Sequence, residues 1–284
     1  MSIVVIGATG KLGRLVVEDL LAKKVPAGDV VAAGRNRTAL EELGALGVRT
    51  ATVDFGRPDT IGAAVSAGDT LLLISGSEVG RRIDQHRNVI EAAKAAGVAR
   101  IVYTSAPQAT TSALILAPEH KATEELIVAS GLPYTILRNG WYNENYVATV
   151  DQARQTGVVL ASAGDGKVSS ANRSDYAEAA AVVLTQDGHE GKVYELSGDT
   201  AWDQGHLASV IGEIIDSPVT YRSVTPEEQA AILKEAGLDE GTIGFVVGLD
   251  GNIRDGLLGE TSGELAALIG HPTVPLAEGL RAAV

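Results

Sequence analysis

Three glycines near the start of the chain have a spacing that suits the binding of a phosphate group. Residues 3–6 are Ile-Val-Val-Ile, and they lead directly into Gly7, Gly10 and Gly13. Glycine lets the backbone adopt a positive φ and lets a ligand lie against the main chain. An apolar helical pattern follows at once, so the N–H groups and the positive dipole end of a helix would face this turn. The natural ligand of such a turn is the pyrophosphate of a dinucleotide.

The position of these glycines matters more than their number, because the chain has 33 glycines. Their spacing differs by one residue from the G-x-G-x-x-G fingerprint, but the motif directly follows a strand and opens a helix, as that fingerprint requires. A plain strand-to-helix turn is the alternative. The candidate cofactor-binding residues of the turn are Gly7, Ala8, Thr9, Gly10, Lys11, Leu12 and Gly13.

The residues after the second expected strand indicate which dinucleotide binds. Arg35 and Arg37 stand there, and no acidic residue lies between Asp29 and Glu41. An NAD-preferring site usually carries an acid at this place, whereas an arginine can bind a 2′-phosphate through its forked N–H groups. Cations are unfavourable at a helix start, so the pair suggests a phosphate, although two solvated arginines are the alternative. The pattern favours NADP(H) bound by Arg35.

Other polar residues follow the remaining strands of the first half. Asp54 could accept a hydrogen bond from an adenine amine, or it could cap the next helix. The stretch Ser75-Gly76-Ser77 could allow close approach of the ribose and nicotinamide, or it could be an ordinary polar loop. Ser105 could bind a carbonyl substrate or the nicotinamide, and Arg173 could meet cofactor phosphate or carboxamide or be a surface charge.

The segment 139–146 carries an unusual load of aromatic and amide groups in a chain that is only 4% aromatic. A flat, partly polar ligand fits such a surface. A hydrophobic seam between two lobes is the alternative. The segment begins with Asn139, Gly140, Trp141 and Tyr142.

The elements that must position these residues alternate between strand and helix. We predict an α/β fold, a Rossmann-type doubly wound parallel sheet with a smaller, mostly helical C-terminal lobe for the substrate. Ligands of such sheets bind beyond the carboxyl ends of the strands. The expected strands are 3–6, 30–33, 50–53, 70–74, 101–105 and 134–137, and the expected helices lie near 13–23, 37–46, 59–66, 84–96 and 120–130.

The rhythm changes after Arg138. We predict a dinucleotide-binding domain over residues 1–140, completed by strands near 158–163 and 193–196. The substrate-binding lobe covers residues 141–284, mainly 141–157 and 198–284. Capping boxes are expected at Thr225 with Glu228 and at Thr261 with Glu264.

Composition narrows the function classes. The formal net charge of −13 disfavours binding to nucleic acid. The apolar runs are too short to cross a membrane, and the first strand begins at Ser2 or Ile3, which leaves no room for a signal peptide. The chain has no cysteine and only five scattered histidines, so we expect no metal and a cytoplasmic protein.

Taken together, the motifs resemble the NmrA-like group of atypical short-chain dehydrogenase/reductases. Those that carry the resemblance are Gly7–Gly13, Glu78-Val79-Gly80, Asn139-Gly140-Trp141-Tyr142 and Gly191–Leu196. Within the group the chain is most similar to the bacterial type 2 NADPH:quinone oxidoreductases, and more distantly to triphenylmethane-dye reductases. The resemblance covers nearly the whole chain and implies two-electron reduction of quinones. It also implies that NADP(H) is bound through Gly7–Gly13, Arg35, the Ser75–Ser77 loop and the segment 139–144. The cofactor contacts it implies in that segment are Asn139, Gly140, Trp141 and Tyr142, with Arg173 a further candidate.

The chain departs from the wider superfamily at the catalytic Tyr-x-x-x-Lys pair. Leu116 stands at the tyrosine place and His120 at the lysine place; choosing Lys121 instead would put Ala117 at the tyrosine place. A quinone tolerates this loss, because the hydroquinone anion formed by hydride transfer is much less basic than an alkoxide and needs a general acid least. The candidate catalytic residues are His120, as proton donor or substrate contact, and Tyr142.

The expected partner is a small planar, quinone-like acceptor, and the expected assembly is a monomer or a homodimer. Two other functions stay open. The chain could be an NADP(H)-binding redox sensor of the NmrA type that regulates a partner without turnover. It could also reduce imines, enones or dyes.

Overall fold

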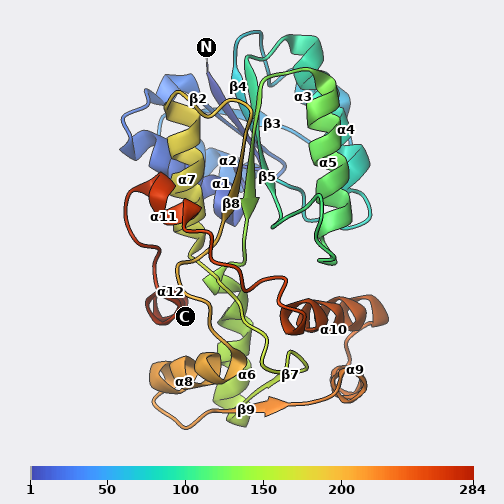
Figure 1. The fold of residues 1–284 in the computed structure, drawn as a ribbon. Coiled ribbons are helices and arrows are strands. Elements are labelled where there is room, and N and C mark those ends of the chain that lie inside the picture. Colours follow the sequence, from blue (N-terminus) through green and yellow to red (C-terminus); the bar gives the residue numbers. More distant parts are fainter. Residues whose placement is uncertain (1) are drawn as a thin grey trace. The chain divides into compact units, whose positions relative to one another are not determined.

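A parallel sheet of seven strands organises the first part of the molecule, shown in the computed structural model of residues 2–284 (Figure 1). The strand order is β3-β2-β1-β4-β5-β6-β8. Ile6 of the first strand lies beside Ala33 on one side and Leu73 on the other, in parallel register with both. The predicted Rossmann-type sheet is thereby confirmed. Its strands are β1 (Ile3–Ile6), β2 (Val30–Gly34), β3 (Arg49–Thr52), β4 (Thr70–Leu73), β5 (Arg100–Ser105), β6 (Tyr134–Asn139) and β8 (Lys192–Leu196).

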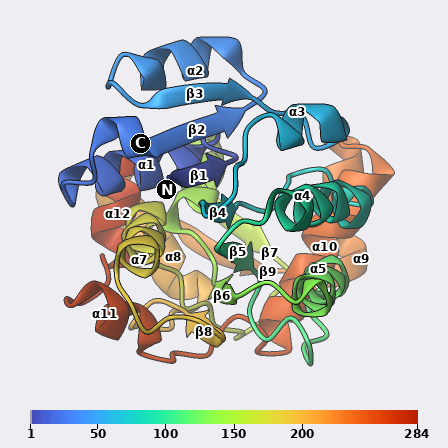
Figure 2. The same ribbon diagram turned by 90° about the horizontal axis from the view of Figure 1, so that it is seen from above.

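Helices cover both faces of this sheet (Figure 2). On one face lie α1 (Lys11–Ala22) and α7 (Arg173–Thr185), and on the other lie α3 (Pro58–Gly62), α4 (Arg82–Ala96) and α5 (Ala117–Ser130). α2 (Arg37–Gly44) packs beside β2 and β3, and a short 3₁₀ turn, η1 (Ala27–Asp29), precedes β2. Helical spacing brings the apolar side chains of α1 to its buried face, namely Leu12, Val16, Val17 and Leu20.

The strand order reverses between β1 and β4. From β1 the chain moves outward to β2 and β3, and it then returns to β4 on the other side of β1. The loops that leave β1 and β4 therefore diverge toward opposite faces and open a crevice at the carboxyl ends of the strands.

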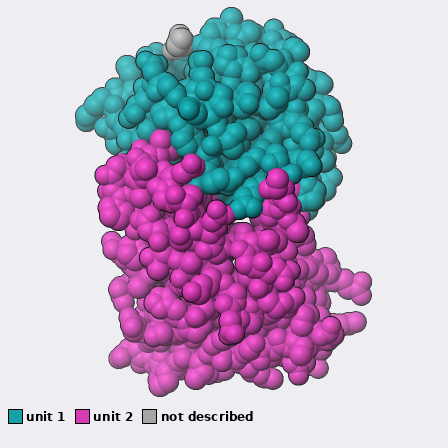
Figure 3. Space-filling model, in the orientation of Figure 1, with its two compact units in different colours: residues 1–110, 118–139, 173–195 teal, residues 111–117, 140–172, 196–284 magenta. Residues whose placement is uncertain are grey.

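The chain divides into two compact units (Figure 3). Unit 1 comprises residues 1–110, 118–139 and 173–195, and unit 2 comprises residues 111–117, 140–172 and 196–284. Unit 2 is mostly helical. Its elements are η2 (Asn143–Tyr146), α6 (Val147–Thr156), β7 (Val158–Ala161), α8 (Gln204–Ile215), β9 (Thr220–Ser223), α9 (Pro226–Glu235), α10 (Glu240–Arg254), α11 (Glu264–Ile269) and α12 (Leu276–Ala283).

Two local predictions for this region are wrong. The strand expected near 158–163 does not join the main sheet: β7 pairs in parallel with β9 in a separate two-stranded sheet. An apolar run indicates a buried strand but does not say which strand it will pair with. The box expected at Thr261 and Glu264 is also absent, since α11 begins after Gly263, whose φ is +72°, and Ser262 Oγ accepts the Glu264 N–H. The box at Thr225 and Glu228 is confirmed.

Among residues 2–284, no helix combines the length and the apolar character needed to cross a bilayer.

The closest backbone approach in unit 1 predicts a stability effect. A Cβ atom at Gly13 would lie 2.3 Å from the Gly7 carbonyl oxygen and 2.6 Å from the Ala8 Cα. Gly13→Ala should therefore push α1 away from β1 and lower the free energy of unfolding by about 1–3 kcal/mol, measured by chemical denaturation. The matched control is Gly62→Ala in α3, where a Cβ would meet nothing within 4 Å. Equal losses in both variants would contradict the steric explanation.

Candidate functional site

The glycine turn after β1 presents bare backbone at the start of α1. Gly7 has a φ of +96°, and the N–H groups of Gly7 and Ala8 both donate to the Ala33 carbonyl at 3.0 Å. Gly10 is the N-cap of α1, so no side chain caps the helix, and its first turn carries no acidic residue. The N–H groups of a first helical turn have no intrahelical partners. Here they face the turn without a side-chain competitor, which suits an anion.

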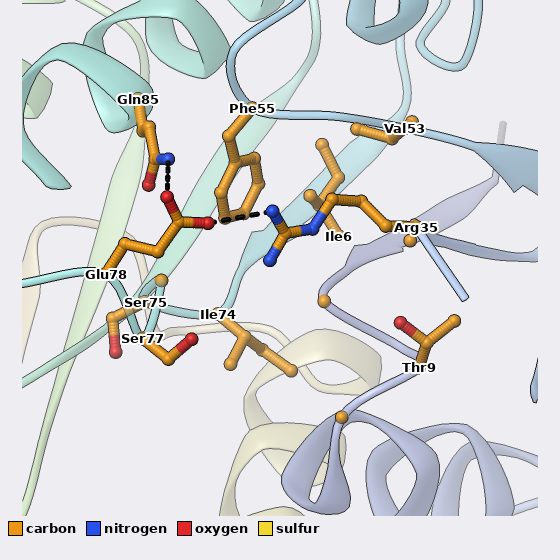
Figure 4. Close-up of a pocket in the computed structure, with 14 residues that line it drawn as sticks. Ile6, Thr9, Arg35, Val53, Phe55, Ile74, Ser75, Ser77, Glu78 and Gln85 are labelled. Atoms are coloured by element: carbon orange, nitrogen blue, oxygen red, sulfur yellow. Dashed lines mark hydrogen bonds and ion pairs between the residues drawn. The ribbon is translucent and has the colours of Figure 1, made fainter. Parts of the chain in front are cut away.

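A cavity opens at this turn, in the crevice where the strand order reverses (Figure 4). It is enclosed by the ends of β1, β2 and β3 and by the loop after β4. Seven residues predicted from the sequence line it: Gly7, Thr9, Gly10, Arg35, Ser75, Gly76 and Ser77. Seven further residues complete the lining: Ile6, Gly34, Val53, Phe55, Ile74, Glu78 and Gln85.

An ion pair spans the cavity. Arg35 Nη1 donates to Glu78 Oε1 at 2.8 Å, and Figure 4 shows the guanidinium turned toward the carboxylate. Glu78 also accepts from Arg81 Nη1 at 3.1 Å and from Gln85 Nε2 at 3.1 Å. The hydrogen bond from Arg35 is the main reason why the pKa of Glu78 is lowered. The sequence analysis did not assign Glu78 or Gln85 to the site; the available signal was an acidic residue directly after the predicted Ser75–Ser77 loop.

Apolar side chains form the wall behind the ion pair. Phe55, Val53 and Ile74 all line the cavity. The Phe55 ring packs edge-on against His86, with ring centroids 6.0 Å apart, and its carbonyl accepts from Asn88 at 2.8 Å. A flat ring can lie against such a surface. Asp54, expected to contact adenine or to cap a helix, accepts the Gly56 N–H in a turn at 2.8 Å. It does not cap α3, whose N-cap is Arg57.

Buried polar groups hold the loop after β4 in place. The Ser75 N–H donates to Thr104 Oγ1 at 2.9 Å. Gly76 is fixed on both sides, because its N–H donates to His86 Nε2 at 2.9 Å and its carbonyl accepts from Arg82 Nε at 2.5 Å. At the far end of the loop, the Gly80 N–H donates to Glu119 Oε1 at 2.9 Å.

The hydrogen bonds assign the protonation state of His86. Thr123 donates its hydroxyl to the Glu119 carbonyl, so its oxygen accepts from His86 Nδ1–H at 2.9 Å, and Nε2 accepts from Gly76. Burial and the nearby Arg82 lower the pKa of His86 to about 4. The imidazole is therefore neutral at pH 7, as its role as an acceptor requires.

His120 lies on α5, deep in unit 1. It is 5% exposed, and its Nδ1 lies 2.8 Å from the Tyr103 hydroxyl. Burial, then the charge of Arg82 and the neighbouring His86, lower the pKa of His120 to about 3. Burial also raises the pKa of Tyr103, so its hydroxyl stays protonated and pairs with a neutral imidazole.

The remaining predicted residues of unit 1 do not line the cavity. Ser105 donates its hydroxyl to Glu124 Oε1 at 2.5 Å, and Glu124 is itself bound by Arg138. The others are Ala8, Leu12 and Gly13, which are buried behind the turn; Lys11, which is exposed on α1; Asn139, which is buried at the end of β6; and Arg173, which is the first residue of α7.

Three predicted residues belong to unit 2. The Gly140 N–H donates to the Leu196 carbonyl at 2.7 Å, and the Trp141 carbonyl accepts from the Ala171 N–H at 3.0 Å. Tyr142 forms a parallel bridge with Ala171. These backbone contacts fix the segment within unit 2. Across residues 2–284, no cluster of three or more histidine and acidic side chains has the arrangement of a metal site.

Known proteins share this chain's sequence and fold. A family model described as NAD(P)H-binding matches residues 7–187. Quinone oxidoreductase 2 of Escherichia coli strain K12 is 48% identical over 278 residues, covering 98% of this chain and 97% of that protein. A crystal structure of NADPH-dependent quinone oxidoreductase from Escherichia coli complexed with NADPH matches with a TM-score of 0.94 and 47% identity, over 98% of both chains. The triphenylmethane reductase of Citrobacter sp. complexed with NADP(H) matches with a TM-score of 0.94 and 37% identity over 100% of both chains.

These similarities extend over nearly the whole chain, from the glycine turn through unit 2. They confirm the resemblance on which the sequence analysis relied. The chain belongs to the NAD(P)H-binding, NmrA-like family.

Proposed function

We propose that this protein is an NADPH-dependent oxidoreductase that transfers hydride to quinones or related flat, conjugated acceptors. The observation that carries the proposal is the cavity at the reversal of strand order, which has the bare backbone of the glycine turn on one side and Arg35 at its rim. It occurs in a chain that is 48% identical to a quinone oxidoreductase over 98% of its length.

The residues present fit NADP(H). Gly7 and Gly10 leave room against the backbone, where a Cβ at Gly7 would approach Ile74 Cβ to 3.0 Å. The uncapped start of α1 would hold the pyrophosphate, and Arg35 would bind the 2′-phosphate. Ser75, Gly76 and Ser77 would meet the ribose and nicotinamide end. Arg173 and Asn139 are further candidate contacts.

When bound, NADPH supplies the hydride, so the protein has mainly to bind and orient two flat groups. Trp141 and Tyr142 of unit 2, with Gly140, would meet the acceptor. His120 is neutral at working pH, so its role would be a hydrogen bond between a neutral imidazole and the acceptor rather than proton transfer from an imidazolium. Water can supply the proton to a hydroquinone anion.

We also propose that the protein works in the cytoplasm, as the absence of cysteine in its sequence suggests. It would act as a monomer or a homodimer.

The central test is turnover. Purified protein mixed with NADPH and a benzoquinone should oxidise NADPH faster than the uncatalysed reaction, measured as the loss of nicotinamide absorbance. Tight NADPH binding with no added rate would favour the redox sensor instead. Turnover with an azo or triphenylmethane dye but not with a quinone would keep the reductase and change its acceptor.

Arg35 should determine cofactor preference. Arg35→Ala should weaken NADPH binding about 10- to 100-fold, because charge-assisted hydrogen bonds to the 2′-phosphate are lost. NADH binding should change little, and titration calorimetry measures both. Arg37→Ala, two residues along and also exposed, is the matched control. Equal losses for NADPH and NADH in Arg35→Ala would remove this residue from the phosphate site.

His120 should contribute without titrating in the working range. Its folded pKa of about 3 means that it is already neutral above about pH 4, so acidification from pH 8 to pH 5 should not increase the rate through this residue. His120→Gln should lower kcat/KM about tenfold by a constant factor across that range. An effect confined to pH values below 6.5 would show that an imidazolium acts as the acid. Thermal denaturation of the variant checks that it is folded.

A further inference from the structure

We propose that Glu78 is a specificity-determining residue: it competes with the 2′-phosphate of NADPH for Arg35 and so limits the preference of this protein for NADPH over NADH. The inference rests on the proposed function, because it assumes that Arg35 meets the 2′-phosphate. It concerns a residue that the cofactor motif itself does not include.

The two side chains face each other across the cavity. Arg35 follows β2 and Glu78 follows β4, so they stand on different rims of the same cavity, 43 positions apart in the chain. Their contact of 2.8 Å spans the cavity (Figure 4). The Arg35 side chain is 61% exposed and that of Glu78 is 30% exposed, so an entering ligand can reach both. A phosphate that binds Arg35 must either take Nη1 from the carboxylate or bind the other guanidinium nitrogens with its negative charge beside Glu78. Glu78 opposes the phosphate in both arrangements.

Glu78 can give up its contact with Arg35 at little cost in free energy, because it has other partners. Arg81 and Gln85 also donate to its carboxylate, both to Oε2, whereas Arg35 binds Oε1. When the phosphate takes Arg35, two of the three partners of Glu78 remain. The ion pair therefore lowers the affinity for NADPH without preventing its binding. This suits a residue that adjusts the ratio of the affinities for NADPH and NADH.

Glu78 cannot easily move away from the rim of the cavity, because the loop that carries it is held on both sides. Gly76, two residues before it, is bound on both sides by His86 and Arg82, and Gly80, two residues after it, is bound by Glu119. Since both flanks of the loop are held by buried or half-buried side chains, the carboxylate stays near the cavity when a ligand enters.

The effect on NADH should have the opposite sign. NADH lacks the 2′-phosphate and presents ribose hydroxyls, which are hydrogen-bond donors that a carboxylate accepts well. With NADH bound, Arg35 can keep its contact with Glu78. The Glu78 carboxylate thus opposes the binding of NADPH and favours the binding of NADH. The ratio of the two dissociation constants measures this effect.

The test is Glu78→Gln, which keeps the shape of the side chain and removes its charge. The dissociation constants of NADPH and NADH are measured by titration calorimetry at low salt. We expect the constant for NADPH to fall about fivefold, the scale of coupling between partly exposed charges, and that for NADH to stay the same or rise. The gain should shrink at high salt, because exposed charges are screened.

Glu178→Gln is the matched control. Glu178 pairs with Lys23 at 3.3 Å, just beyond the C-terminal end of α1. The length of α1 places Lys23, and with it the charge of Glu178, about 18 Å from the glycine turn. This variant removes the same charge from unit 1, and it should leave both dissociation constants unchanged.

Several outcomes would overturn the inference. Unchanged NADPH binding in Glu78→Gln would mean that Glu78 does not compete for Arg35, and weaker binding would mean that Glu78 positions Arg35 for the phosphate. If the gain persists in full when Arg35→Ala is added, Glu78 does not act through Arg35. Failure of the proposed function looks different: the unaltered protein would then not bind NADPH or would not reduce an acceptor. Thermal denaturation confirms that each variant is folded.

Discussion

Unit 1 depends on a contact made of backbone atoms, where the start of α1 lies against the end of β1. Three close approaches surround this contact. Gly13 lies against the Gly7 carbonyl, and Gly34 lies against the Thr9 side chain. Ile74 lies against Gly7. These residues come from the ends of β1, β2 and β4 and from the first turn of α1. Because Gly7, Gly13 and Gly34 have no side chains, α1 can pack closely against β1 and the backbone of the turn stays open to a ligand. Close packing and ligand binding therefore both require glycine at these positions.

A second requirement is electrostatic. The protein has a formal net charge of −13, and a dinucleotide phosphate adds more negative charge. Attraction must therefore come from local groups, namely Arg35 at the cavity and the helix N-terminus beside it. Arg82 lies deeper and is only 9% exposed. It holds the Gly76 carbonyl, and its charge helps to keep His86 and His120 neutral. A buried cation thus keeps the polar groups beneath the loop in one protonation state.

The sequence predicted the sheet well, because each strand of unit 1 ends in a turn signal and is followed by a helix pattern. It also brought Gly7, Arg35 and Ser75 to one edge, since the carboxyl ends of parallel strands meet there. It did not indicate that Ser105 would donate to Glu124, because that contact depends on how α5 packs on β5 and β6. Nor did it reveal the pairing of Arg35 with Glu78, which requires knowing that the ends of β2 and β4 face each other across β1. The partner of β7 could not be predicted either, because β9 lies about sixty residues further along the chain. The short apolar run of β7 does not indicate which strand it will pair with.

The division of the chain has a consequence for its synthesis. Each unit is built from three separate segments, so the polypeptide passes between them five times. After residues 1–139 have been synthesised, six of the seven strands of the main sheet exist, and β6 is one of its two edge strands. The outer backbone groups of β6 have no strand to pair with until β8 is made at residues 192–196. An unpaired strand at the margin of a sheet is a template for association with other chains. The nascent protein therefore exposes this unpaired edge strand while more than fifty further residues are translated. Unit 1 is complete only when residue 195 has been made, and by then two segments of unit 2 already interrupt it.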